Sequence, residues 1–169
     1  MSGRGAEFLP WPDPRLKAVA APVGVVDDEV LETWVRMLEA MYAMPGVGLA
    51  APQIGVSRRL AVVDCEQGGR APVRLADPEI IDLATEMREH EEASPNLPGV
   101  SAKVKRPAWA LVSYIGENGI RTRRRFEGLW ATSVQHQIDH LNGMLFIDRL
   151  SRTKRQMVLG KYNKLRRKG

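Results

Sequence analysis

Apolar side chains recur at helical spacing in two separate stretches of the chain. Within residues 28–44 they fall three or four positions apart, which is the repeat of a helix with one buried face. Asp27 precedes this stretch as a candidate N-cap, and Pro45-Gly46 follows it as a stop signal. A second apolar stripe of the same spacing covers residues 128–141 and ends at Asn142-Gly143. We therefore predict helices over 28–44 and 128–141.

Shorter apolar runs predict several strands. Residues 59–64 form one run, and residues 73–76 form a second run that Asp77-Pro78 breaks. Two further runs, 108–115 and 120–126, flank the sequence Gly-Glu-Asn-Gly, which is typical of a β-hairpin turn. The chain therefore contains at least one hairpin of consecutive antiparallel strands.

Other segments complete this outline. The small, glycine-punctuated residues 46–55 predict a loop, residues 79–92 show no clean period, and residues 94–99 are rich in turn formers. Residues 152–168 predict a basic C-terminal helix, with a possible break at its glycine. The predicted order is helix, several strands, helix, strand, helix. Because hairpins outnumber crossovers, we predict a single α+β domain over residues 1–169, with antiparallel sheets packed around a central helix.

Length and cysteine content limit the class of protein. The 169 residues suit one domain with a sizeable core, and the single cysteine, Cys65, excludes an internal disulfide framework. No apolar run approaches the roughly 18 residues of a membrane span, and residues 1–7 lack the apolar core of a signal peptide. We therefore expect a cytoplasmic protein without membrane contact.

Charge is distributed unevenly. Residues 149–169 contain nine Lys and Arg residues and no Asp or Glu, so the rest of the chain has 16 bases against 20 acids. The simplest interpretation is one solvated helix face. The alternative is contact with an anionic surface such as RNA, which would make the ribosome a candidate partner.

Two of the three histidines form a possible metal-binding pair. His136 and His140 lie four positions apart on the predicted central helix, so both imidazoles share one face and can bind one ion. Gln137 stands where a zinc protease has its catalytic Glu, and an amide cannot transfer that proton. Asp139 is a candidate to orient a metal ligand. The alternative is two helix histidines and a carboxylate with no metal, and any third ligand must lie upstream.

Three segments, in order, resemble the motifs of the peptide deformylase family. Residues 46–53 (GVGLAAPQ) are similar to its first motif, residues 92–99 (EASPNLPG) to its second, EGCLSxPG, and residues 136–143 (HQIDHLNG) to its third, HExDHLxG. The resemblance implies the family's α+β fold around the helix that carries the histidine pair. It also implies removal of the formyl group from N-formylmethionine, with one divalent metal, Fe²⁺ or Zn²⁺, held by two His and one Cys.

The resemblance assigns roles residue by residue. His136 and His140 match metal ligands, and Gln53 matches the glutamine that stabilises the oxyanion. Two positions depart from the family: Ser94 replaces the Cys ligand, and Gln137 replaces the catalytic Glu. The segment 47–49 matches the loop that lines the substrate cleft, namely Val47, Gly48 and Leu49.

A third departure concerns the second oxyanion donor. Pro95 stands where the family offers a backbone N–H to the oxyanion, and proline has none. The motif glutamate Glu92 is expected to pair with an arginine, for which Arg106 is our choice. His90 is expected at the surface, although it could supply a third ligand if its segment is looped. Cys65 is expected to be inert packing.

These losses predict a protein without useful deformylase activity. A serine hydroxyl is a weak neutral ligand, so we expect the divalent metal to be weakly bound or absent. The cleft could still bind formyl-Met or Met-starting peptides, and the basic helix could still contact the ribosome. The alternative is an active or weakly active hydrolase that removes the N-formyl group from nascent proteins.

Overall fold

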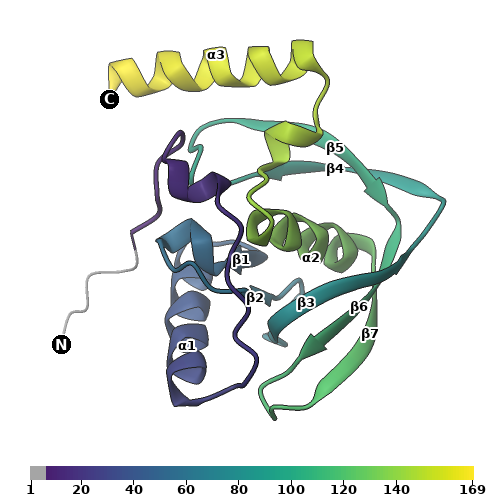
Figure 1. Ribbon diagram of the computed structural model, residues 1–169. Helices are drawn as coiled ribbons and strands as arrows, with labels where there is room; N and C mark the ends of the chain where they lie inside the picture. The colour runs from purple at the N-terminus through teal and green to yellow at the C-terminus, as the bar shows by residue number, and fades with distance from the viewer. Residues whose placement is uncertain (1–6) are drawn as a thin grey trace.

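The computed structural model describes residues 7–169 (Figure 1), so residues 1–6, on which the signal-peptide expectation rests, lie outside the described part. The helical elements in this part are η1 (Pro14–Lys17), α1 (Asp28–Ala43), η2 (Ala51–Ile54), α2 (Gly128–Leu141), η3 (Phe146–Arg149) and α3 (Arg152–Lys168), where η denotes a 3₁₀ turn. The strands are β1 (Gly48–Ala50), β2 (Leu60–Val63), β3 (Val73–Leu83), β4 (Met87–Ala93), β5 (Ser101–Pro107), β6 (Trp109–Ile115) and β7 (Arg121–Glu127).

The strands form two antiparallel sheets. The larger sheet has the order β1-β2-β3-β6-β7, and β4 pairs with β5 in the smaller one. The predicted hairpin is present, since β6 and β7 pair from Trp109↔Glu127 to Ile115↔Arg121. The predicted α+β fold with antiparallel sheets is therefore confirmed.

Helix α2 lies at the centre, between the larger sheet and the β4–β5 pair (Figure 1). Its residues from Ala131 to Leu141 are all buried, which is the pattern of a helix enclosed on every side. Val134, Ile138 and Leu141 belong to the core cluster shared with the larger sheet. The opposite face of α2 carries polar side chains, and these build the site described below.

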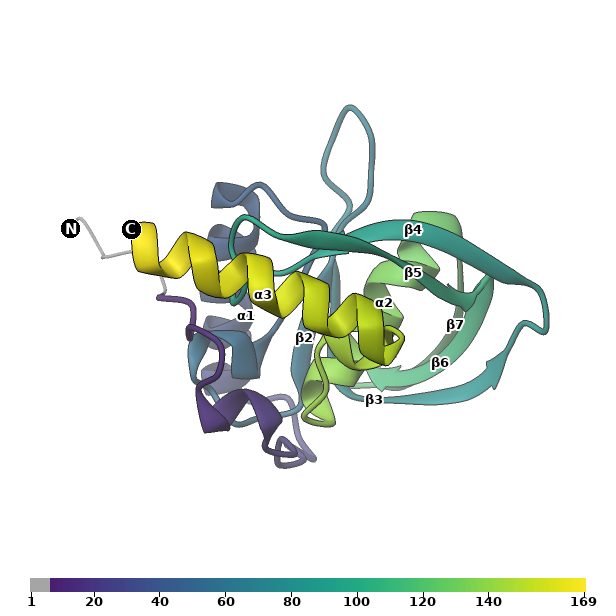
Figure 2. The ribbon, with the colours of Figure 1, turned by 90° about the horizontal axis from the view of Figure 1, so that it is seen from above.

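The remaining helices pack outside this centre. The apolar face of α1 (Trp34, Met37 and Met41) packs against Leu60 and Val62 of β2. Helix α3 lies outside the β4–β5 pair (Figure 2), and Tyr162 is its one buried residue among those described. Helix α3 runs through Gly160 without a break. None of the described helices is long and apolar enough to cross a membrane.

Strand β3 corrects the prediction of a break at Asp77-Pro78. The strand continues through both residues, with a register shift against β6 between Ala76 and Glu79. Asp77 has a φ of 46°, and its carboxylate accepts hydrogen bonds from the backbone N–H groups of Val23 and Gly24. A bulge accommodates a proline that donates no ladder hydrogen bond, and these tertiary bonds hold it in place.

Three further expectations differ from the structure. The predicted loop 46–55 contains a short strand and a 3₁₀ turn, β1 and η2. Residues 79–92, which lack a clean period, contain the end of β3 and most of β4, joined by residues 84–86. Residues 101–107 form β5, which the sequence pattern did not predict. The strand expected after α2 is the 3₁₀ turn η3. Partly exposed short strands carry a weak periodic signal because only alternate side chains are constrained.

The turn after α2 packs closely against the backbone of Lys17. Gly143 has a φ of 77°, and a Cβ there would overlap the backbone carbonyl of Lys17. We expect Gly143→Ala to lower the free energy of unfolding by about 2 kcal/mol or more. The control is Gly160→Ala in the interior of α3, where nothing lies within 4 Å of the added Cβ. It should raise stability by about 0.5–1 kcal/mol. Urea denaturation measures both, and equal effects would contradict the close approach.

Candidate functional site

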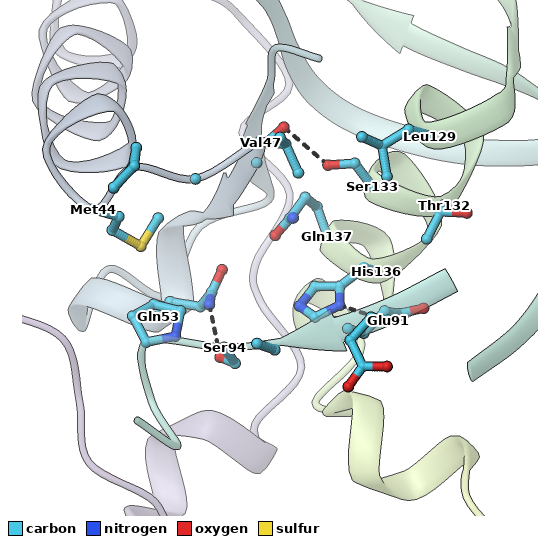
Figure 3. A pocket seen from close by; sticks show the side chains of 16 residues that line it. Met44, Val47, Gln53, Glu91, Ser94, Leu129, Thr132, Ser133, His136 and Gln137 are labelled. Atoms are coloured by element: carbon cyan, nitrogen blue, oxygen red, sulfur yellow. Dashed lines mark hydrogen bonds and ion pairs between the residues drawn. The ribbon is translucent and has the colours of Figure 1, made fainter. Parts of the chain in front are cut away.

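A cavity of about 440 Å³ opens between the segment before β1, the end of β4 and the first half of α2. Figure 3 shows side chains from all these segments around it. His136 and Gln137 come from α2 and Gln53 comes from η2, while Ser94 directly follows β4. Four residues singled out in the sequence thus meet at one place.

The segment 47–49, which was expected to line the substrate cleft, lies partly at the cavity and partly in the core. Val47 and Gly48 line the cavity. Leu49 is fully buried and belongs to the core cluster that contains Trp34 of α1. Successive side chains of a strand point to opposite faces, so Leu49 does not share the cavity, contrary to the prediction.

The two imidazoles face each other. Nε2 of His136 lies 3.1 Å from Nε2 of His140. Nδ1 of His136 forms a hydrogen bond of 2.7 Å with Oε1 of Glu92, so the glutamate fixes the orientation of this ring. Burial, with a smaller contribution from the charges of His136 and Arg106, holds the pKa of His140 well below its ordinary value. The pair therefore contains at least one neutral imidazole at pH 7.

A buried ion-pair network supports the pair. Arg106 bonds Glu92 at 2.6 Å and Asp139 at 2.9 Å, and Arg149 bonds Asp139 at 2.7 Å. The expected pairing of Glu92 with Arg106 is confirmed. Burial alone would raise the pKa of Glu92, but hydrogen bonds from His136 and Arg106 lower it overall. The carboxylate that orients a histidine is Glu92 and not Asp139, because Asp139 is engaged by both arginines.

The hydrogen-bonding capacity of the Ser94 hydroxyl is fully used. It donates to Oδ1 of Asn96 at 2.9 Å, and it accepts from Nε2 of Gln53 at 3.2 Å and from the backbone N–H of Asn96 at 3.3 Å. A hydroxyl has one donor hydrogen and two lone pairs. All three are engaged within the protein, so no lone pair of Ser94 is left for another ligand.

The same cluster also occupies Gln53. Its Nε2 donates to Ser94 Oγ and to Asn96 Oδ1 at 2.9 Å, which uses both amide hydrogens. Its Oε1 accepts from the backbone N–H of Ala50. Asn96 is anchored in turn, since its Nδ2 donates to the carbonyls of Leu9 and Gln53. Gln53 is therefore held firmly, but it has no free N–H to offer.

Two buried polar atoms near the cavity have no hydrogen-bond partner among the described residues, namely Oε1 of Gln137 and Nδ1 of His140. The side chain of Gln137 is 4% exposed. The carboxamide lies between Val47 and His136 at the wall of the cavity (Figure 3). A Cβ at Gly48 would overlap Nε2 of Gln137, so the glycine is required for this close approach. No hydrogen bond engages Nε2 of Gln137 either, so the carboxamide has both an acceptor and donors without a partner among the described residues.

Residues 6–156 match the sequence model of the polypeptide deformylase family. The chain belongs to the polypeptide deformylase family. It is 45% identical over 158 residues to the peptide deformylase of Agrobacterium fabrum, covering 92% of this chain and 93% of the relative. It is 43% identical to that of Rhizorhabdus wittichii, covering 95% and 94% of the two chains.

Solved structures of peptide deformylases share the fold. The enzyme from Ehrlichia chaffeensis superposes with a TM-score of 0.91 at 30% identity and covers 98% of both chains. The enzyme from Legionella pneumophila gives a TM-score of 0.89 at 38% identity, with 97% of this chain and 96% of that chain covered. The arrangement of α2 between two antiparallel sheets is therefore the deformylase arrangement.

Deformylases use a divalent metal ion, but the donors of this chain do not fit a firmly held one. The histidine pair is suitably placed, whereas Ser94 has no free lone pair and does not ionise as a thiol does. Within residues 7–169, no group of three or more His, Cys, Asp or Glu side chains is arranged to hold a metal. The pair therefore lacks a third anchor of the kind that catalytic sites use.

Two residues considered as substitutes lie elsewhere. His90, expected at the surface, is partly exposed, and its Nδ1 lies 2.8 Å from the hydroxyl of Thr132. Burial and the charge of Asp64 raise the pKa of Cys65 to about 12, so its thiol stays protonated at pH 7. Neither side chain completes the histidine pair.

Sequence reasoning missed Asn96 as an organiser of the site and missed Thr132 and Ser133 as cavity residues. Thr132 and Ser133 lie four positions before His136 and Gln137, so the helical repeat already placed them on the same face. No role was assigned to Asn96 from the sequence. Its role depends on a contact with Gln53, 43 positions away, that no local pattern indicates.

Removal of Arg106, the buried cation of this network, should strongly lower the free energy of unfolding. We expect Arg106→Met to lower the free energy of unfolding by about 3–5 kcal/mol, because Glu92 and Asp139 would stay buried with less compensation. The control is Arg88→Met on β4, whose pair with Glu86 is exposed and spans 4.0 Å. It should change stability by less than about 0.5 kcal/mol. Similar losses in both variants, measured by urea denaturation, would show that the network is not stabilising.

Proposed function

We propose that this protein binds peptide N-termini in its deformylase cleft and does not hydrolyse them. The saturated hydroxyl of Ser94 is the observation that carries the proposal. A metal needs deprotonated or free electron-pair donors, and two imidazoles alone hold an ion loosely. We infer that a divalent ion, Fe²⁺ or Zn²⁺, is weakly bound or absent.

The catalytic groups support the same conclusion. Gln137 has no accessible proton equilibrium, so it cannot act as the general acid and base of amide hydrolysis. The two oxyanion donors are also missing, because Pro95 has no N–H and both amide hydrogens of Gln53 are engaged. Loss of a general base alone typically costs about 10²–10⁴ in rate.

The relatives favour a second candidate, deformylase activity itself. They are named peptide deformylases at up to 45% identity. The peptide deformylase of Acinetobacter baumannii has been solved with Met-Ala-Ser bound, and that of Ehrlichia chaffeensis with actinonin. These names support the cleft as a place for Met-starting peptides. They favour hydrolysis of N-formylmethionine by this chain more than they favour its loss, so the decision depends on Ser94 and Gln137.

We also propose that residues 1–169 form one domain that works in the cytoplasm. The family match spans residues 6–156 and ends within the first turns of α3. Basic side chains without any acid cover α3, and most of them are exposed. This charge supports contact of α3 with the ribosome as part of the proposal.

A direct assay separates the two candidates. Protein prepared anaerobically with ferrous iron should retain little metal after gel filtration. Its kcat/KM on formyl-Met-Ala-Ser should lie at least about 10²-fold below that of the Agrobacterium fabrum relative prepared in parallel. Metal content and formate release are the two measurements. One firmly bound ion per chain with comparable kcat/KM would establish the enzyme and refute the binding protein.

A reversion tests the roles of the two substitutions. Ser94→Cys should raise metal affinity, because a thiolate replaces a saturated hydroxyl, without restoring useful turnover. Adding Gln137→Glu should restore activity in part, since Pro95 still lacks its N–H. Equilibrium metal titration and formate release follow the two steps. Unchanged metal affinity in both variants would show that residue 94 is not at the ligand position.

A further inference from the structure

We propose that the arginine-rich edge of the larger sheet, with the tryptophans beside it, binds single-stranded RNA. Strand β7 is the last strand of that sheet, whereas the basic helix α3 lies outside the β4–β5 pair (Figure 1), so the two basic surfaces are separate. This inference goes beyond the proposed function and does not depend on what the cleft binds. We name the six side chains the β7 surface: Arg121, Arg123, Arg124, Arg125, Trp109 and Trp130.

The positive charge of this surface is largely uncompensated. All four arginines are exposed, and within the described residues Arg125 is the one that forms an ion pair, with Glu127 at 2.9 Å. That pair is exposed as well, so exchanging the carboxylate for a phosphate costs little. Two acids of β3, Glu79 and Asp82, pair in register with β6 and are therefore separated from β7 by a whole strand. Such a concentration of one charge favours a polyanion as the partner.

The spacing of the arginines suits a phosphate backbone. Arg121, Arg123 and Arg125 share one face of β7, and alternate residues of a strand lie roughly 6.6 Å apart, which is similar to the distance between consecutive phosphates of an extended nucleic acid. Arg121 is already positioned, since it donates to the hydroxyl of Ser113 at 2.9 Å and to the carbonyl of Asp77 at 3.3 Å. A row with a fixed repeat favours a nucleic acid over a membrane, whose fluid surface requires no repeat.

Two partly exposed tryptophans add groups on which bases can stack. The guanidinium of Arg125 lies 4.2 Å from the ring centroid of Trp109, and that of Arg124 lies 5.8 Å from the ring of Trp130. Bases of a single strand stack on aromatic rings and on guanidinium planes, whereas those of a duplex are stacked on one another. An arginine-rich edge also discourages pairing with another sheet, but that role requires no exposed ring. The combination therefore indicates single-stranded RNA.

Fluorescence anisotropy of a labelled oligouridylate, titrated with the full chain at several salt concentrations, tests the charge argument. Arg123→Gln combined with Arg125→Gln should weaken binding about tenfold at low salt. It should also lower the slope of log Kd against log salt by about 1.4, because each phosphate contact on a single strand contributes about 0.7. The matched control, Arg36→Gln combined with Arg88→Gln, removes the same charge from exposed positions of α1 and β4 and should leave both quantities unchanged.

A second pair of variants tests the stacking argument. Trp109→Ala should weaken oligouridylate binding about tenfold, because a stacking platform is lost. Trp109→Phe, which keeps an aromatic ring, should bind within about threefold of the unsubstituted chain. Thermal unfolding of each variant establishes that it is folded. Equal binding by folded Trp109→Ala and by the unsubstituted chain would contradict the role of the ring.

Three results would overturn the proposal. Equal weakening by the β7 variant and by its matched control would show that the charge of the whole chain acts without a defined surface. Unchanged binding by the β7 variant, with loss on Lys164→Gln combined with Arg167→Gln, would assign the RNA contact to α3 alone. Co-sedimentation with vesicles of phosphatidylcholine and phosphatidylserine, without binding of oligouridylate, would assign the β7 surface to a membrane.

Discussion

One buried cation holds the layers of this protein in register. Arg106 of β5 lies between Glu92 of β4 and Asp139 of α2, and all three side chains are at most 8% exposed. Removing a guanidinium from water costs several kcal/mol, so it is stable here only while both carboxylates remain. Because Glu92 also fixes the ring of His136, the ion pair that joins the small sheet to α2 also sets the geometry of the imidazole pair.

The stability of this fold does not depend on a thiolate at position 94 or a carboxylate at position 137. Buried polar atoms must find partners whatever the chemistry of the site. In this chain Ser94, Asn96 and Gln53 satisfy one another and so close the position where a thiolate would bind a metal. The fold therefore superposes on deformylases with a TM-score of 0.91 while hydrogen bonds among these three side chains satisfy the polar atoms at its centre.

The sequence predicted the parts of the structure that depend on local periodicity. Both apolar helices and the β6–β7 hairpin were found because their spacing or turn chemistry is distinctive. The continuation of β3 through Asp77-Pro78 was not predicted, because it depends on hydrogen bonds that the distant residues Val23 and Gly24 donate. The motif positions placed His136, Gln53 and Ser94 together, and the pairing of Arg106 was inferred correctly. The engagement of every hydrogen-bonding group of Ser94 could be seen only in three dimensions.

Family membership and donor chemistry answer different questions about this cleft. The relatives establish that the chain has the deformylase fold, since almost the whole chain aligns with them. Hydrolysis also requires that the cavity present donors to an oxyanion and a base to a proton. Here Gln53 and Ser94 direct their donors toward each other and Asn96, while Oε1 of Gln137 and Nδ1 of His140 are buried without a partner among the described residues. Family membership therefore supports the fold and the place of the cleft, whereas our proposal of a cleft without hydrolysis depends on Ser94, Pro95 and Gln137.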